Sequence, residues 1–222
     1  MVDFGDLTVH TTMSDQYDIS SDGEVSFQEA AVVKELNINF RNDATVTDLS
    51  GLRYFTALTT LPAGIFAGCG NLSTVWLPQG ISNLSSAFQN CKALSRLTLP
   101  VSEPVSITVT SATFSGVDLS ACTLRVPFGS KDAYAQANVW KDFGNITEIR
   151  LDGEGSALDD LLERAAQQGI DATAEQAVYD SHESTDADLT AAVASLRQKL
   201  HYIDFTDNRT QTLCIENWDT NL

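Results

Sequence analysis

Apolar residues recur with a period of 22 residues through the middle of the chain. The positions of one copy and of the next are Phe66, Cys69, Leu72, Val75, Leu77 and Pro78, then Phe88, Cys91, Leu94, Leu97, Leu99 and Pro100. A looser third copy holds Phe114, Leu124, Val126 and Pro127, and a partial earlier copy holds Phe55, Leu58, Leu61 and Pro62. Such periods are typical of repeat proteins, in which each repeat buries its apolar side against its neighbours. We therefore expect these side chains to form a continuous core, and each Leu-x-Leu-Pro segment to form a short strand that proline ends.

The first 36 residues combine helical periodicity with a polar segment. Apolar residues that would share one helix face are Val9, Met13 and Tyr17 before the polar segment, and Val32, Val33 and Leu36 after it. Asp6 stands where an N-cap side chain would close the start of the first helix. The pattern predicts a helix, a loop and a second helix over residues 1–36.

Helical periodicity returns after residue 150. Gly153 and Gly155 predict a linker, because glycine weakens both helices and strands. Helices are expected over residues 156–168, 174–179 and 186–201, and Gly169 is expected to end the first of them. Residues 151–202 are therefore predicted to form a small helical spacer.

Residues 203–222 resemble residues 2–21 when the two stretches are aligned without a gap. The identities pair Asp3 and Phe4 with Asp204 and Phe205, Asp6 with Asp207, Thr11 with Thr212, and Asp18 with Asp219. We expect a helix over residues 207–217 and an incomplete loop at Asp219 that binds no ion. The chain is then a fragment of a tandem protein, and its predicted parts are 1–36 helix-loop-helix, 37–150 repeats with a terminal cap, 151–202 helical spacer and 203–222 truncated start of a second module.

The polar segment follows the spacing of an EF-hand loop. Asp18, Ser20, Asp22, Gly23, Ser26 and Glu29 occupy positions 1, 3, 5, 6, 9 and 12 of such a loop. Ca²⁺ needs converging oxygen atoms, and a final Glu can bind it through both carboxylate oxygens. The expected ligands are the side chains of Asp18, Ser20, Asp22, Ser26 and Glu29 and the backbone carbonyl of Glu24. The alternative needs no metal: Asp22-Gly23 forms a turn, and Ser26 with Glu29 forms a capping box.

Composition limits the partners and the chemistry. The chain has 222 residues and a formal net charge of −17, which argues against nucleic acid and anionic membrane surfaces and is compatible with cations. No apolar run is long enough to cross a membrane. His10, His182 and His201 lie in three separate segments, without a nucleophile motif or a glycine-rich phosphate loop. We predict no catalytic residues and expect the chain not to be an enzyme.

The segment from Ala87 to Pro100 follows the pattern Ala-Phe-x-x-Cys-x-x-Leu-x-x-Leu-x-Leu-Pro. In this it resembles the BspA-type leucine-rich repeats of bacterial cell-surface proteins. The terminal element of that family is similar to the segment that holds Ser130, Tyr134, Trp140, Phe143 and Ile146 to Ile149. The Asp18–Glu29 loop resembles a segment that precedes the repeats in some of these proteins and, more distantly, half of a dockerin. The resemblance covers residues 40–150 and implies an extracellular or cell-surface location in a bacterium, with an adhesion or scaffolding role.

The sequence thus predicts an α+β fold: a short leucine-rich-repeat solenoid with an N-terminal EF-hand-like helix-loop-helix and a C-terminal small helical bundle. The expected function is non-enzymatic binding of a protein or glycan partner by a calcium-stabilised monomer. Trp76, beside Leu77 in a repeat strand, is the candidate ligand-binding residue. Two alternatives stay open: a passive spacer in a multidomain surface protein, and a dockerin-like docking module, which would need two complete loops.

Overall fold

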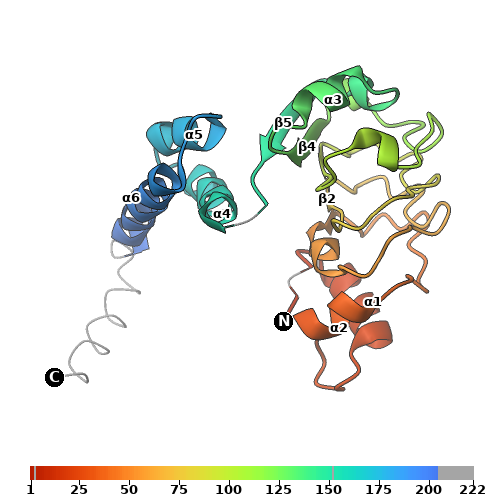
Figure 1. Cartoon of the computed structure of the whole chain (residues 1–222). Coiled ribbons are helices and arrows are strands. Elements are labelled where there is room, and N and C mark those ends of the chain that lie inside the picture. Colours follow the sequence, from red (N-terminus) through yellow and green to blue (C-terminus); the bar gives the residue numbers. More distant parts are fainter. Residues whose placement is uncertain (3, 152, 205–222) are drawn as a thin grey trace. The chain divides into compact units, whose positions relative to one another are not determined.

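The computed structural model describes residues 1–2, 4–151 and 153–204 of the chain (Figure 1). The chain divides into two compact units, Met1–Glu148 and Ile149–Leu222. The first contains almost all of the sheet, and the described part of the second is mostly helical. The predicted helix over residues 207–217 and the incomplete loop at Asp219 lie outside the described residues.

Five short strands form one sheet. In chain order, which is also their order across the sheet, they are β1 (Asp48–Leu49), β2 (Thr74–Trp76), β3 (Arg96–Thr98), β4 (Thr123–Pro127) and β5 (Asn145–Ile149). The sheet is all-parallel, and with the six helices of the described residues it makes an α/β fold. The predicted α+β fold with a leucine-rich-repeat solenoid is therefore wrong. In α+β folds the helices are segregated from an antiparallel sheet, whereas here the chain returns after each strand and lays the next one in the same direction.

The register of the sheet separates an inner row of side chains from an outer row. The inner row, from β1 to β4, contains Leu49, Val75, Leu97 and Leu124, all 0% exposed. Trp76, Thr98 and Arg125 pair one residue further along. Because successive residues of a strand point to opposite faces, these three lie on the outer face. β2 and β3 each end just before a Leu-Pro pair, as predicted.

The repeat phenylalanines stack into a column within the core. Its members are Phe40, Phe66, Phe88 and Phe114, whose successive ring centroids lie 5.9, 5.8 and 5.9 Å apart. The buried thiols of Cys69 and Cys91 donate to the backbone carbonyls of Phe40 and Phe66, at 2.9 and 3.2 Å. The recurring apolar positions therefore form a core, as the period predicts.

The predicted earliest copy of the repeat is wrong in register. Phe40, not Phe55, begins the column. Phe55 instead contacts Phe4 and Tyr17 of the N-terminal segment, at centroid distances of 6.2 and 6.0 Å. The spacing from Phe40 to Leu49 equals that from Phe66 to Val75, but an offset of 26 residues separates these two copies, so a search at one fixed period misses the first.

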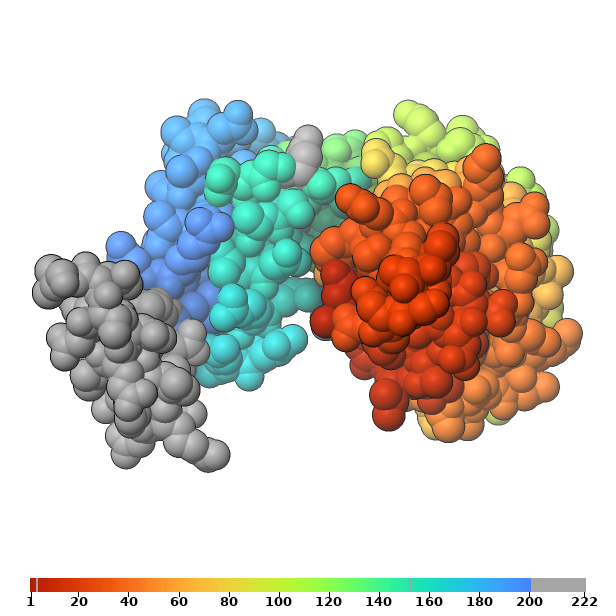
Figure 2. All heavy atoms as spheres, turned by 90° about the horizontal axis from the view of Figure 1, so that it is seen from below, coloured from red at the N-terminus to blue at the C-terminus, as the bar shows by residue number. Residues whose placement is uncertain are grey.

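The first helix, α1 (Leu7–Tyr17), forms as predicted. It belongs to the N-terminal end of the first unit, which faces the reader in red and orange in Figure 2. Asp6 caps it: Oδ1 accepts hydrogen bonds from the backbone N–H groups of Thr8 and Val9, at 2.8 and 3.2 Å. Oδ2 accepts from the backbone N–H of Thr47 at 2.7 Å, which ties the helix start to the segment before β1. Val9 and Met13 are 0% exposed, because they cover the end of the core.

The second helix is shorter than predicted. α2 (Phe27–Val32) has 6 residues, and the side chain of Val32 is 63% exposed. Leu36 is buried but lies beyond the end of the helix. Val32, Val33 and Leu36 therefore do not form a helix face. The capping box at Ser26 fixes where the helix starts, and the chain leaves helical geometry at Val33.

The opposite end of the core is closed by α3 (Lys131–Gln136), a 3₁₀ turn η4 (Trp140–Asp142) and β5. The Trp140 ring lies 6.0 Å from that of Phe114, so the aromatic column ends on it. Ser130 stands at the predicted N-cap of α3, but its side chain makes no capping hydrogen bond. A Glu148 oxygen instead accepts from the backbone N–H groups of Gly129 and Lys131, at 2.9 and 3.1 Å.

The second unit contains α4 (Gly153–Gln168), α5 (Thr173–Asp180) and α6 (Asp186–Asp204), near the predicted bounds. Gly153 and Gly155, predicted as a linker, belong to the first turn of α4. Gly155 is needed there, because a Cβ atom would lie 2.5 Å from that of Arg150. Gly169 follows α4 with a positive φ of 68°, as expected for a residue that ends a helix. Among the described residues, no helix is both long and apolar enough to cross a membrane.

Candidate functional site

Asp18 organises the first half of the loop between α1 and α2. Its Oδ2 accepts a hydrogen bond from the backbone N–H of Gly23 at 2.7 Å. Its Oδ1 accepts from the hydroxyl of Ser20 and the backbone N–H of Asp22, at 3.1 and 3.3 Å. Desolvation raises the pKa of Asp18, but these hydrogen bonds outweigh it and lower the pKa. Val25 is 0% exposed beneath the loop.

Glu29 organises the second half. Oε1 accepts from the backbone N–H groups of Ile19 and Ser20, at 2.9 and 2.8 Å. Oε2 accepts from the backbone N–H of Ser26 at 2.8 Å, and the Ser26 hydroxyl accepts from the Glu29 N–H at 3.2 Å. This is the capping box that the sequence left open as the metal-free alternative. Hydrogen bonds from Ser26 and Ser20 lower the pKa of Glu29 to about 2, so the carboxylate stays ionised.

The hydrogen bonds of Asp18 and Glu29 limit how many carboxylate lone pairs are available to a cation. An ionised carboxylate offers about four lone-pair sites, and Asp18 and Glu29 each accept three hydrogen bonds within the loop. A Ca²⁺ ion bound by both Glu29 oxygens would compete with the N–H groups of Ile19 and Ser20. In the part of the chain that the structure describes, no group of three or more His, Cys, Asp or Glu side chains is arranged to hold a metal. The donors suit a hard cation, but their arrangement is that of the capping box.

A row of aromatic and arginine side chains lies on the outer face of the sheet. At its centre is Trp76 of β2, which is half-buried. The Arg53 guanidinium carbon lies over the Trp76 ring at 4.7 Å from its centroid, and over the Tyr54 ring at 4.8 Å. Phe27 of α2, 49% exposed, places its ring 4.7 Å from that of Tyr54. Arg53 and Tyr54 come from the 3₁₀ turn η1 (Ser50–Tyr54), directly after β1.

Arg125 of β4 extends the row beyond Trp76. Its guanidinium carbon lies 5.8 Å from the Trp76 ring centroid, although Thr98 of β3 separates the two residues in the sheet. Two strand spacings amount to about 10 Å. The side chains of Trp76 and Arg125 therefore lean toward each other over Thr98, which is 1% exposed. We call Phe27, Tyr54, Arg53, Trp76 and Arg125 the aromatic–arginine row.

Sequence reasoning found only one member of this row. The alternation of the repeat strand indicates that Trp76 points outward. Phe27 comes from the N-terminal segment, and Arg53 with Tyr54 from a turn outside the recurring positions, so only the fold brings them to Trp76. The recurring pattern gave no signal for Arg53 or Tyr54, because a search at one fixed period misses the copy that contains β1.

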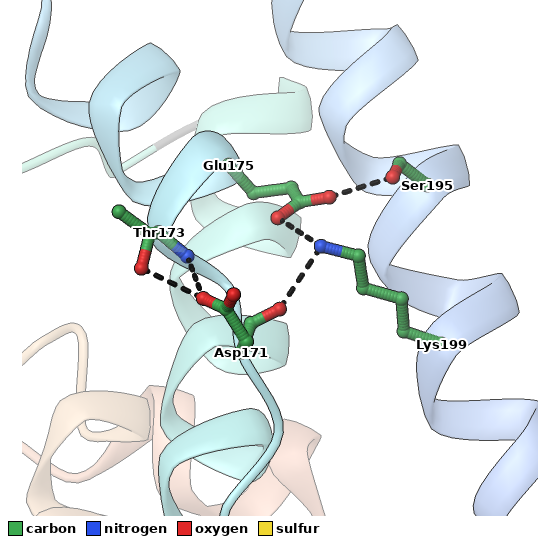
Figure 3. A network of polar contacts seen from close by, with 5 residues as sticks. All are labelled: Asp171, Thr173, Glu175, Ser195 and Lys199. Atoms are coloured by element: carbon green, nitrogen blue, oxygen red, sulfur yellow. Dashed lines mark hydrogen bonds and ion pairs between the residues drawn. The ribbon is translucent and has the colours of Figure 1, made fainter.

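The second unit contains a network of polar contacts around the buried carboxylate of Glu175 (Figure 3). Glu175 of α5 is 4% exposed, and its Oε2 lies 2.7 Å from the Lys199 ammonium of α6. The Ser195 hydroxyl donates to Oε1 at 2.6 Å, and Lys199 also donates to the Asp171 carbonyl at 3.0 Å. Burial raises the pKa of Glu175, but Lys199 and Ser195 outweigh it and lower the pKa. The network stabilises the contact between α5 and α6.

Other candidate reactive groups are held in structural roles. The cysteines Cys69, Cys91 and Cys122 are free and buried. Burial raises the pKa of Cys69 to about 11 and that of Cys91 to about 12, so neither is a thiolate at neutral pH. His10 places its ring edge-on to Phe4, at 6.1 Å between centroids. A groove of about 440 Å³ in the second unit is lined mainly by apolar and small side chains, including Leu162, Ala166, Ile170 and Ala177.

Comparison with models of known protein families gave no match, and comparison with curated proteins gave none either. The functional proposals below therefore depend on the geometry of the described residues and on the motifs of the sequence.

Proposed function

We propose that the chain is a non-enzymatic module that binds a protein or glycan partner through the aromatic–arginine row. The observation that supports this is the row itself. Trp, Tyr and Arg are the residue types enriched at binding hot spots, and here they contact one another outside the core. The contact of Arg53 with Trp76 plays no part in packing the hydrophobic core. The half-buried Trp76 ring leaves contact area for a partner.

The location belongs to the same proposal. The resemblance of residues 87–100 to repeats of bacterial cell-surface proteins supports a place outside the cell or on its surface, where a binding module meets its partners. The module is proposed to act as a monomer.

We also propose that the Asp18–Glu29 loop binds Ca²⁺. The expected ligands are the side chains of Asp18, Ser20, Asp22, Ser26 and Glu29 with the backbone carbonyl of Glu24. Binding would replace the amide hydrogen bonds of Glu29 to Ile19 and Ser20 with contacts to the cation. The supporting observation is that both end carboxylates already lie against Ser20, one on its hydroxyl and one on its N–H.

The calcium proposal is tested by thermal unfolding in excess Ca²⁺ and in excess chelator. A bound cation stabilises the folded state, so Ca²⁺ should raise the melting temperature of the wild-type chain. Asp18→Ala should remove this dependence, and Asp15→Ala, at an exposed position in α1, should keep it. Equal melting temperatures in both solutions would contradict the calcium site.

The binding proposal is tested by probing protein and glycan arrays with the labelled chain and with Trp76→Ala. The wild type should bind at least one target, and Trp76→Ala should bind it at least about tenfold more weakly, as expected for loss of a hot-spot aromatic residue. Thr59→Ala, at an exposed position outside the row, should bind as the wild type does. The passive-spacer alternative predicts no target for any variant, and the dockerin-like alternative predicts tight binding to a cohesin-like domain that depends on Asp18 and not on Trp76.

A further inference from the structure

The Arg53 guanidinium contacts two aromatic rings, but no other described residue accepts a hydrogen bond from it. Its central carbon lies over the Tyr54 and Trp76 rings, 4.8 and 4.7 Å from their centroids. Within the described ranges, it makes no hydrogen bond and no ion pair. A guanidinium carries five N–H donors around its edge, and stacking on aromatic rings occupies only the faces. Arg53 is therefore a pre-ordered set of donors that no other described residue satisfies.

Arginine is the main charged residue type on the outer face of β1 to β4. The outer-face residues of β1 to β4 are Asp48, Thr74, Trp76, Arg96, Thr98, Thr123 and Arg125. With Arg53, this face carries three arginines and one acidic residue, in a chain whose formal net charge is −17. Distant carboxylates are screened over about 8 Å at physiological ionic strength, so the nearby Arg53 guanidinium favours a negative charge at the row.

We propose that Arg53 binds a carboxylate of a protein partner, presented beside an apolar side chain that packs against the exposed rings of the row. This proposal rests on the proposed binding function and names its ligand chemistry. The planar fork of an arginine matches the two oxygens of a carboxylate, and the two rings hold it in one orientation, which lowers the entropy lost on binding. Phe27, 49% exposed at the end of the row, supplies apolar contact area for the neighbouring side chain.

A protein partner fits this surface better than a sugar. Sugars stack their C–H faces on bare aromatic faces. Here Arg53 lies over both the Trp76 and Tyr54 rings, and Arg125 also lies over Trp76. The ring edges and the N–H donors of Arg53 remain for a partner, and these suit a carboxylate with an adjacent apolar group.

The test titrates the isotopically labelled full chain with a short, end-capped peptide in which Glu and Leu alternate. Its companions are the same peptide with Gln in place of Glu, and an oligogalacturonate as an acidic glycan. The Glu peptide should shift the side-chain N–H resonances of Arg53 and Trp76 and bind at least about tenfold more tightly than the Gln peptide, because bonds to a charged acceptor are the stronger ones. Equal binding of the Glu and Gln peptides, or binding of the oligogalacturonate alone, would overturn the proposal.

Three variants complete the test. Arg53→Gln should abolish binding of the Glu peptide, and Arg53→Lys should weaken it about tenfold, since an ammonium keeps the charge but lacks the fork. Arg41→Gln, which removes the same charge at an exposed position outside the row, should bind as the wild type does. If array targets depend on Trp76 but not on Arg53, the carboxylate inference fails and the binding function stands. If neither array nor peptide binds, both fail.

Discussion

Asp18 and Glu29 show how a loop can be ordered by its own amides. Between them their four oxygens accept six hydrogen bonds, five from backbone N–H groups and one from the Ser20 hydroxyl. Backbone donors at a turn and at a helix start are otherwise unsatisfied, so an ionised carboxylate stabilises both. The EF-hand spacing and the metal-free network therefore draw on the same residues, which is why the sequence left both open.

The first prediction concerns the pH dependence of Glu29. Its pKa is lowered to about 2 in the folded chain, from an ordinary value of 4.5. Because the folded pKa lies below the unfolded one, the stabilisation is complete above the ordinary value and is lost as the pH falls toward about 2. Glu29→Gln should be less stable than the wild type at neutral pH, and the difference should shrink over this window.

Carbon-detected NMR of the Glu29 carboxyl group, in chelator, measures this pKa directly. A midpoint near 4.5, the ordinary value, would show that the capping box and loop bonds do not hold in solution.

A second prediction at the residue scale concerns Gly144, which lies directly before β5. A Cβ atom there would lie 1.8 Å from the backbone carbonyl oxygen of Ser120. Gly144→Ala must push two backbone segments apart and should lower the free energy of unfolding by about 1–3 kcal/mol, as overpacking does. Gly70→Ala, where nothing lies within 4 Å of the added atom, is the control and should change stability little. Urea denaturation of both variants would decide, and equal stability of the two would contradict the close approach.

At the scale of elements, the strands depend on the column of phenylalanines and not on their own length. β2 and β3 have 3 residues each, too few to be stable alone. Each is held because Val75 or Leu97 is buried in the inner row, and a stacked phenylalanine of the same repeat fills the core beside it. Loss of one ring should therefore affect its neighbouring repeats as well as its own.

The third prediction tests this dependence with Phe88→Ala. Phe88 is 0% exposed between Phe66 and Phe114, and removing such a ring should cost about 3–5 kcal/mol of unfolding free energy. Hydrogen exchange should increase in β2, β3 and β4 together. Phe27→Ala removes the same ring at a 49% exposed position and should cost much less. If Phe88→Ala were as stable as Phe27→Ala, the stacked phenylalanines would not be what stabilises the neighbouring strands.

The elements also show what the sequence could and could not predict. The stacking of Phe66 on Phe88 and the pairing of Val75 with Leu97 follow from spacing alone, because identical offsets must place side chains above one another. Phe40 and Leu49 begin the column and the inner row at a different offset, so spacing alone does not find them. The end of α2 and the capping of α3 depend on tertiary contacts: Leu36 is buried without a helix, and Glu148 replaces the Ser130 side chain as the acceptor at α3. Arg125 lies between the recurring Leu124 and Val126, so strand alternation predicts an outward direction for it as it does for Trp76. Phe27, Arg53 and Tyr54 lie outside the recurring positions, so their place in the aromatic–arginine row could not be predicted.

At the scale of the whole chain, two hydrophobic cores share no residue. One runs through the sheet unit and includes Leu97, and the other joins α4, α5 and α6 and includes Leu196. Both leucines are 0% exposed. A core that is complete within its own unit can unfold as its own cooperative transition, so we expect each unit to have its own free energy of unfolding.

The last prediction separates the two cores with matched substitutions. Leu97→Ala and Leu196→Ala remove the same atoms from fully buried sites, and each should cost its own unit about 2–5 kcal/mol. In native-state hydrogen exchange, Leu97→Ala should speed exchange in β1 to β4 and leave α4 to α6 protected, whereas Leu196→Ala should do the reverse. Glu175 and Lys199 lie in the second unit, so the backbone amides beside them should exchange faster in Leu196→Ala and not in Leu97→Ala. If either variant increased exchange equally in both units, the chain would unfold as one cooperative body and the division into two would not hold in solution.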